Sequence, residues 1–430
     1  MKRYMGIGPA VCVGLAALLL GGCTGTDTQG ASQGLSRGTV LSMESTPVID
    51  YTLPHLTPNI LVDSIGYEAG REKEAAVKGK ELPETFWLYD AETGEAVYRG
   101  TIEEESCDQE LGLYMGYADF SEYTGEGTYY LECQGIGRSY SFSIQKNLYG
   151  QLYEELSQEI LARCTENTAQ VWEVMELLTA CEWYPQLLTD ADENQIPDTL
   201  EEIGLWIQTV EEAEAFEEND ALYAALLAKF SYVYQKYDRT FATQCLQKAS
   251  QVFEKAQSTL QKDTEIFFAL TELFRATGLS TYGKQIRDYR TYFENNTSYL
   301  EEEEYLYGSM TYLSTRQKVD RELCSIFMEK LMDRGEEISV RCEEIIHPLE
   351  ARNNGAGQLL NQAGQLSCAN YVLNNYQYTS VIEKFLHYLM GENLESVCFY
   401  SPREAQSGYL LLFAQLAATA DITEGQTIDE

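Results

Sequence analysis

The sequence predicts a multidomain protein in which a small all-β sandwich is followed by a larger all-α domain. Within residues 57–146, short apolar runs alternate with Gly-containing turns, a pattern typical of the strands of a sandwich. From Leu148 to about Thr419, the apolar residues recur at helical spacing instead. The chain has 430 residues, which is enough for two or three domains with well-filled cores.

The first 22 residues have the features of a bacterial export signal. Lys2 and Arg3 precede the apolar run Val11–Leu20, which is shorter than the roughly 20 residues that span a bilayer. The next tetrad, Leu20-Gly21-Gly22-Cys23, resembles a bacterial lipobox, which implies cleavage before Cys23 and diacylation of its thiol. An ordinary signal peptide with a chance cysteine is the alternative. We expect a bacterial cell-envelope protein, lipid-anchored through Cys23 on the outer face of the cytoplasmic membrane.

Two further segments lie outside the expected domains. Residues 23–56 are rich in Gly, Ser and Thr, which is typical of a flexible tether, and residues 421–430 form a polar, acidic tail. The formal net charge is −38, and so negative a chain repels nucleic acid. We therefore expect no nucleic-acid partner.

The β segment contains several short strands bounded by turns. The expected strands are Ile60–Val62, Thr85–Tyr89, Ala96–Tyr98, Thr128–Cys133 and Ser139–Ile144. Alternation in the last strand predicts that Tyr140, Phe142 and Ile144 share one face.

The helical segment, residues 147–420, contains helices every twenty-odd residues with short connections. Thr277-Gly278 is a C-cap signal that ends one of these helices, and Gly391 follows the helix Val381–Met390. We treat Glu301–Glu304 as a solvated helix start or loop. This repetition predicts paired helices arranged around a toroid or a solenoid.

An acidic loop between two expected helices has the spacing of a calcium ligand set. Asp190, Asp192, Asn194 and Glu201 occupy the first, third, fifth and twelfth positions of a calcium loop, but Gln195 stands where such loops need Gly. The alternative is an acidic turn followed by carboxylates that stabilise a helix N-terminus. We expect no required cofactor, with calcium as the candidate ligand of this loop.

The β segment resembles the N-terminal immunoglobulin-like domain of the cellulases of glycoside hydrolase family nine. The matching stretches are Ile60 to Tyr67, Tyr89 to Tyr98, Asp119 to Tyr129 and Gly137 to Ile144. The helical segment is similar to the six-hairpin (α/α)6 barrel of the same family. Its matching stretches are Leu177 to Glu182, Asn194 to Ile203, Glu272 to Gly278, Asn354 to Ala363 and Phe385 to Asn393. The resemblance covers roughly residues 57–418 and implies a plant-type polysaccharide such as β-glucan as partner.

The catalytic segments of the family are incomplete in this chain. In the family, a Gly-Gly-Trp-His/Tyr-Asp-Ala-Gly-Asp segment positions the attacking water of an inverting mechanism and precedes the helix that here begins near Gln170. No such segment exists here, and no Asp lies between Asp119 and Asp190. The His-containing substrate loop that follows the equivalent of Asn393 is also absent. These departures predict impaired catalysis.

Glu404 is the best counterpart of the family's catalytic acid. The family's Asn is replaced by Arg403, and a neighbouring guanidinium favours the ionised carboxylate, which is the wrong direction for a general acid. Inverting hydrolysis needs a second carboxyl about 6.5–9.5 Å away. Glu166 and Asp190 are the remaining candidates for that role.

Three hypotheses follow for the function. The chain is a surface lipoprotein that binds or acts on glycan without efficient hydrolysis, an active inverting endoglucanase with rearranged carboxylates, or a non-catalytic envelope protein that binds a partner. Glycan retention and sugar release distinguish the three.

Overall fold

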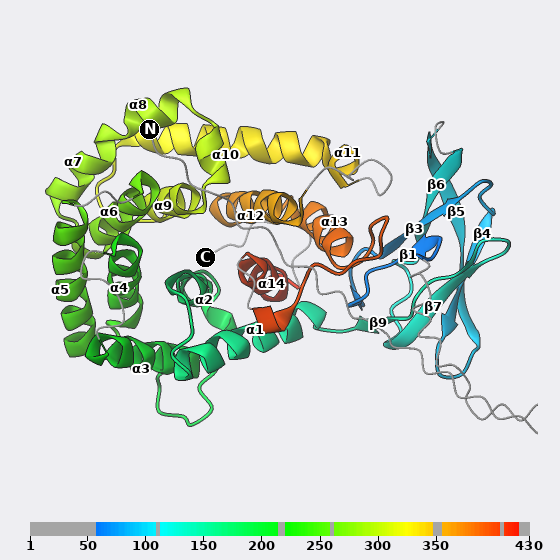
Figure 1. Ribbon diagram of the computed structural model, residues 1–430, viewed down its shortest axis with the longest axis horizontal. Helices are drawn as coiled ribbons and strands as arrows, with labels where there is room; N and C mark the ends of the chain where they lie inside the picture. Colours follow the sequence, from blue (N-terminus) through cyan, green and yellow to red (C-terminus); the bar gives the residue numbers. More distant parts are fainter. Residues whose placement is uncertain are drawn as a thin grey trace, which may run out of the picture. The chain divides into compact units, whose positions relative to one another are not determined.

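The computed structural model describes residues 57–108, 112–213, 220–258, 262–346, 355–404 and 408–420 (Figure 1). The expected leader, the tether with Cys23 and the acidic tail lie outside the described residues, so these predictions stay as they were stated. No helix in the described part combines the length and the apolar character that crossing a bilayer requires.

The β-sandwich consists of two sheets that share one long strand. Its strands are β1 (Ile60–Leu61), β2 (Tyr67–Glu68), β3 (Glu74–Gly79), β4 (Thr85–Asp90), β5 (Ala96–Asp108), β6 (Leu113–Asp119), β7 (Gly127–Cys133), β8 (Gly137–Arg138) and β9 (Phe142–Gln145). They are ordered β1-β3-β6-β5-β4-β7-β9-β2, with β8 paired to β7. The first part of β5 pairs with β4 and its second part pairs with β6, and the register shifts between Glu104 and Ser106. A bulge of this kind bends a strand, so β5 passes from one sheet to the other.

Alternation along the strands fills the core of the sandwich. Phe86 and Leu88 of β4 are fully buried, whereas Trp87 between them is 39% exposed. The prediction for the last strand is confirmed for Phe142 and Ile144, which are buried, and is wrong for Tyr140, which is 42% exposed. The reason is that β9 begins only at Phe142, so the alternation does not extend back to Tyr140.

The helices follow in chain order after β9. They are α1 (Leu148–Thr165), α2 (Val171–Trp183), η1 (Pro185–Leu187), α3 (Asp198–Glu212), α4 (Ala221–Tyr234), α5 (Arg239–Ala256), α6 (Asp263–Thr277), α7 (Ser280–Asp288), α8 (Arg290–Asn295), η2 (Ser298–Glu301), α9 (Glu303–Leu313), α10 (Arg321–Val340), α11 (Cys342–Ile346), α12 (Ala356–Leu373), α13 (Thr379–Leu389), η4 (Pro402–Glu404) and α14 (Tyr409–Ala418). The predicted C-cap is confirmed at Gly278, which ends α6 with a φ of 68°.

The helices form two concentric rings, which confirms the predicted (α/α)6-barrel fold class. The inner ring contains α2, α4, α6, α9, α12 and α14, and each packs against the next. Figure 1 shows α1, α3, α5 and α10 on the outside of these helices. The sequence explains which helices are inner and which are outer. The inner helix α4 is buried on almost all sides, whereas the outer helix α5 buries one face, which includes Ala242, Cys245, Ala249, Val252 and Phe253.

The sandwich contacts the barrel through backbone and charged groups. Ser64 donates a backbone hydrogen bond of 3.0 Å to the carbonyl oxygen of Met390, at the end of α13. Asp63 Oδ2 lies 2.8 Å from Nδ1 of His387 on the same helix. Arg71 donates from Nη2 to the carbonyl oxygen of Leu416 on α14, at 2.9 Å. We call this contact region the seam.

Candidate functional site

The start of α2 is where the resemblance places the missing aspartates, and Glu173 is the carboxylate in its first turn. Glu173 Oε2 accepts a hydrogen bond of 3.0 Å from the backbone N–H of Gln170, which caps the helix. Glu173 Oε1 lies 3.0 Å from Nη1 of Arg163. Both carboxylate oxygens of Glu173 are therefore used to hold the end of α1 against the start of α2.

The segment with the candidate acid meets this helix end. Arg163 donates from Nη2 to the carbonyl oxygen of Arg403 in η4, at 2.7 Å, and Gly408 donates its backbone N–H to Glu176 Oε1 of α2, also at 2.7 Å. The backbone of Glu404 lies in η4, and its side chain lies outside the description. The two segments assigned to catalysis by resemblance thus come together, and the role of Glu404 stays a prediction.

The two substitute carboxylates lie at different ends of α2. Glu166 is the exposed C-cap residue of α1 and is four residues before Gln170. Asp190 follows the other end of α2, which has 13 residues and is therefore about 20 Å long. The length of α2 thus separates Asp190 from the helix start that Arg163 connects to η4, whereas the carboxyls of an inverting pair are about 6.5–9.5 Å apart.

Aromatic side chains of the inner helices meet within the barrel. Trp172, in the first turn of α2, lies with its ring centroid 5.7 Å from that of Tyr307 and 5.8 Å from that of Phe268. Trp183, at the other end of α2, lies 6.0 Å from Tyr307 and stacks on Tyr371 at 4.2 Å. Trp172 is partly exposed, so it is the member of this cluster that a ligand can reach from the α2 start.

A second acidic group lies near this aromatic cluster. Burial raises the pKa of Glu303, the first residue of α9, and the charge of Glu304 adds to this effect. Burial also raises the pKa of Tyr307, and the charges of Glu176 and Glu303 contribute to that shift. The sequence predicts a solvated helix start or loop at Glu301–Glu304, and α9 does begin at Glu303, which is partly buried, whereas the two residues before it are exposed.

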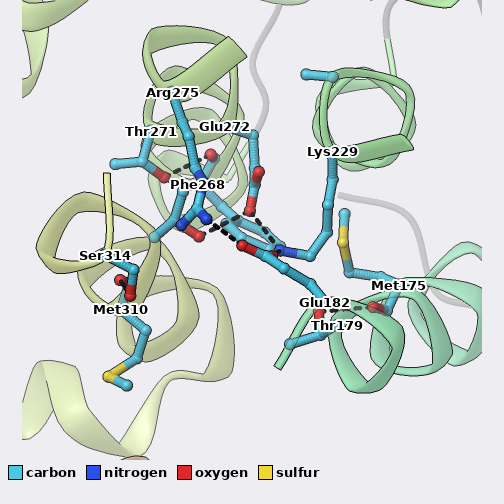
Figure 2. A network of polar contacts seen from close by, with 12 residues as sticks. Met175, Thr179, Glu182, Lys229, Phe268, Thr271, Glu272, Arg275, Met310 and Ser314 are labelled. Atoms are coloured by element: carbon cyan, nitrogen blue, oxygen red, sulfur yellow. Dashed lines mark hydrogen bonds and ion pairs between the residues drawn. The ribbon is translucent and has the colours of Figure 1, made fainter. Parts of the chain in front are cut away.

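Charged residues are buried together at the opposite ends of α2, α4 and α6. Lys229 Nζ lies 2.6 Å from Glu182 Oε2 and 3.3 Å from Glu272 Oε1, and Arg275 forms an ion pair with Glu182. Figure 2 shows Lys229 and Arg275 reaching the two carboxylates from neighbouring helices. Lys229 is 2% exposed and Glu272 is fully buried. Two cations and two carboxylates balance, so the group is neutral as a whole.

Neutral hydroxyls complete this network. Tyr232 OH donates to Glu272 Oε2 at 2.8 Å and Thr311 Oγ1 donates to Glu272 Oε1 at 2.7 Å. Burial acts to raise the pKa of Glu182, but Lys229 and Arg275 outweigh it, and the pKa lies below its usual value. The sequence analysis did not identify this network. Its available signal was the presence of charged residues inside otherwise apolar helices.

The acidic loop brings together only part of the predicted calcium ligand set. Carboxylate oxygens of Asp190, Asp192 and Asp198 lie within 4.8 Å of one another. Asn194 instead donates its side-chain N–H groups to Asp192 Oδ2 at 3.0 Å and to Glu201 Oε1 at 2.9 Å. Gln195 adopts a φ of 73°, the left-handed conformation that such loops usually give to Gly. Calcium binding stays a prediction, with Asp198 as an additional oxygen donor.

Comparison with protein families identifies both domains. Residues 55–138 match the cellulase N-terminal Ig-like domain, and residues 205–405 match glycosyl hydrolase family 9. The helical part of the chain therefore matches family 9 over residues 205–405. The chain is 34% identical over 95 residues to Endoglucanase D of Acetivibrio thermocellus. That alignment covers 22% of this chain and 15% of the relative, so the chain spans only a small part of the curated relative that it matches.

Solved structures share the fold at low sequence identity. A metagenome-derived family 9 endoglucanase has a TM-score of 0.66 at 16% identity, over 79% of this chain and 84% of that one. A Bacteroides ovatus GH9 structure has a TM-score of 0.63 at 14% identity, over 84% of this chain and 98% of that one. AaCel9A in complex with cellobiose-like isofagomine has a TM-score of 0.61 at 16% identity, over 79% and 84% of the two chains. At these identities the likeness concerns the fold.

Proposed function

We propose that this chain is a lipid-anchored envelope protein that binds plant-type polysaccharide such as β-glucan and hydrolyses it poorly or not at all. The observation that carries the proposal is the use of Glu173. Both of its carboxylate oxygens hold the helix start and Arg163, at the position where the family relies on aspartates to hold water.

The neighbouring carboxylates support the same conclusion. Glu176 is 3% exposed and accepts the backbone N–H of Gly408, so it also holds two chain segments together. Freeing either carboxylate for a water molecule would leave a buried donor without its acceptor, which costs about 1–3 kcal/mol. Hydrolysis by an inverting mechanism would then begin from a destabilised site.

Glycan binding is supported by the aromatic residues at the same end of the barrel. Sugar rings present C–H faces that pack on aromatic rings, and Trp172 is partly exposed beside Tyr307. A chain that keeps these aromatic contacts and lacks the paired catalytic carboxyls would bind glycan without efficient bond cleavage.

The test uses the purified chain with insoluble β-glucan, cellulose and xylan, and follows retention and released reducing ends. We expect retention without release, and loss of retention in Trp172→Ala. Trp87→Ala is the matched control, because Trp87 is exposed on the sandwich, and it should keep retention. Equal retention by both variants would place glycan binding elsewhere, and sugar release abolished by Glu404→Gln would overturn the claim of impaired hydrolysis.

The alternative of an active endoglucanase is favoured by one observation, the raised pKa of Glu303. A raised pKa keeps a carboxyl protonated to higher pH, which suits a general acid. Sugar release lost in Glu303→Gln, and kept in Glu304→Gln, would support that alternative. An envelope protein that binds only a protein partner would show neither release nor retention.

The anchor is tested separately in a bacterial expression host. Fatty-acid labelling of the chain should disappear in Cys23→Ser, and the variant should leave the membrane fraction. Labelling that persists in the variant would contradict anchoring at Cys23.

A further inference from the structure

A pocket opens at the seam, between the sandwich and the helices α11 and α13. Strands β3 and β6 contribute Glu74 and Tyr117, and the loop before β3 contributes Glu72. The helical side contributes Glu343, Ile346, Ser380, Glu383, Lys384, His387, Tyr388 and Glu392. Glu72 and Glu343 are exposed and form the rim, whereas Glu383, His387 and Glu392 are buried. The glycan-binding proposal does not involve this pocket.

The lining of the pocket contains more carboxylates than cations. Lys384 Nζ lies 3.6 Å from Glu74 Oε2, and Arg71 Nε, next to the pocket, lies 3.5 Å from Glu383 Oε1. Lys73 is a third, buried cation whose charge interacts with that of Glu383. Among the described residues, no cationic nitrogen lies within 4.0 Å of the Glu72, Glu343 or Glu392 carboxylates. The rim carboxylates Glu72 and Glu343 therefore supply negative charge that a bound cation would neutralise.

An independent observation points to a ligand that donates hydrogen bonds. His387 is 6% exposed and forms part of the pocket wall. Asp63 Oδ1 accepts the backbone N–H groups of Ile65 and Gly66, and Asp63 Oδ2 lies 2.8 Å from Nδ1 of His387. In the neutral tautomer that donates from Nδ1 to Asp63, the opposite ring nitrogen Nε2 is an acceptor, and Nε2 has no hydrogen-bond partner within the described part of the chain. A buried acceptor without a donor is unfavourable, and a donor in the pocket would correct it.

The spacing of the acidic groups favours an organic cation over a metal ion. In the described ranges, three or more acidic, His or Cys side chains bring ligand atoms within 4.8 Å of one another only in the acidic loop. The described residues of this pocket contain no such group. A metal ion needs several ligands around one point. Tyr117, Tyr388 and Ile346 supply apolar wall between the charged groups, which suits methylene carbons.

We propose that the seam pocket binds a small organic diammonium ion, with one ammonium group donating to Nε2 of His387 and to the buried carboxylates. The second ammonium group lies near the rim carboxylates Glu72 and Glu343. Binding would join residues of the sandwich to residues of α11 and α13, and so stabilise the contact between the two domains.

The protonation of the buried carboxyls sets the direction of the pH dependence. The pKa of Glu383 is raised to about 7, chiefly by burial, with smaller contributions from the charges of Glu72 and Glu68, while the charge of Arg71 acts to lower it. Burial also raises the pKa of Glu392 well above its usual value. The groups that face these two carboxyls are Arg71, Lys73, His387, Glu72, Glu68, Glu74, Asp63, Lys384, Tyr67 and Tyr149. A diammonium ion prefers ionised carboxylates, so affinity rises with pH through about 7 and binding releases protons.

Titration calorimetry of the full chain with putrescine tests the proposal, and butanediol, its uncharged analogue of similar size, is the control ligand. At about pH 8 and physiological salt we expect one saturable site for putrescine and none for butanediol. We expect weaker binding at about pH 6. Equal heats for the two ligands would overturn the proposal, as would many weak sites for putrescine, which would mean general attraction to the acidic surface. Tight binding of calcium or magnesium at the same site, with no putrescine binding, would also overturn it.

Two neighbouring carboxylates on α11 provide a matched pair of variants. Glu343 lines the pocket, whereas Glu344 pairs with Arg341 and does not line it. Glu343→Gln should weaken putrescine binding about two- to five-fold, the range for a single exposed charge interaction, and Glu344→Gln should leave it unchanged. Equal losses in both variants would overturn the proposal. Both residues are exposed, so both variants should fold, and unchanged melting curves confirm it.

Discussion

Replacing Lys229 by methionine removes the cation at the centre of the buried network. Methionine keeps the apolar stem, so the change leaves two buried carboxylates with fewer partners. Removing one partner from a buried ion pair costs about 3–5 kcal/mol. Glu182 keeps Arg275, and Glu272 keeps the hydroxyls of Tyr232 and Thr311, so we expect about 3 kcal/mol, at the lower end of that range.

Urea unfolding followed by far-UV circular dichroism measures this loss, because most helices belong to the barrel. The matched control is Lys255→Met, which changes an exposed lysine of α5 and should shift stability by less than about 0.5 kcal/mol. The double variant Lys229→Met/Glu272→Gln should recover about 1 kcal/mol relative to Lys229→Met, since the amide removes one buried charge, its oxygen accepts from one hydroxyl and its NH2 group donates to the other.

The pH dependence supplies a second check on the same residues. The pKa of Glu182 lies below its usual 4.5, so in the native protein its ion pairs contribute stability above pH 4.5, and that contribution is lost as the pH falls through the lower folded value. In Lys229→Met the attraction is weaker and burial raises the pKa. The difference in the free energy of unfolding between the native chain and Lys229→Met should therefore shrink as the pH falls from about 7 to about 4. An unchanged difference, or a loss no larger than that of Lys255→Met, would refute the reasoning.

Three further predictions concern the seam and the acidic loop. Asp63→Asn removes the charge that holds Nδ1–H of His387, and should cost about 1.5–3 kcal/mol and separate the melting of the sandwich from that of the barrel in calorimetry. Gly391→Ala should destabilise the seam by about 1–3 kcal/mol, because Gly391 has a φ of 136° and an added Cβ would lie 3.0 Å from the Val62 carbonyl oxygen. Added calcium should raise the melting temperature, and Asp192→Asn should reduce that shift.

Each of these predictions has a control within the chain. Glu95→Gln changes an exposed acidic residue of the sandwich and should leave a single melting transition. Gly357→Ala places a Cβ in open space in the first turn of α12 and should be neutral or slightly stabilising, so equal losses at Gly357 and Gly391 would contradict the steric argument. If calcium raises the melting temperature of the native and Asp192→Asn chains equally, or of neither, the loop is not a calcium site.

Local signals predicted much of the fold. The end of α6 at Gly278 followed from a single capping residue, and the burial of Phe142 and Ile144 followed from alternation. Strand β3 was not predicted. Its burial is nearly continuous after Glu74, so it lacks the alternation by which a strand with one exposed face is recognised.

The candidate site was less predictable, because its partners are distant in sequence. The resemblance placed the start of α2 and Glu404 at the site, but the ion pair between Arg163 and Glu173 could be located only in three dimensions. Lys229 stands in an apolar helix, and no local pattern states that its partners are Glu182 and Glu272 on two other helices. Ion pairs depend on which helices are neighbours, and spacing along one helix does not contain that information.

The seam also constrains the order of events during synthesis. Asp63 and His387 are 324 positions apart, so the first strands of the sandwich emerge long before the helix that completes their surroundings. At about 5–20 residues per second, a ribosome needs roughly 16–65 s to make the intervening chain. During that time Asp63 and Arg71 have no barrel to contact. A nascent chain interrupted before α13 would therefore expose Asp63 and Arg71 of the sandwich to chaperones and proteases. Only a nearly complete chain can cover these residues with its own C-terminal helices.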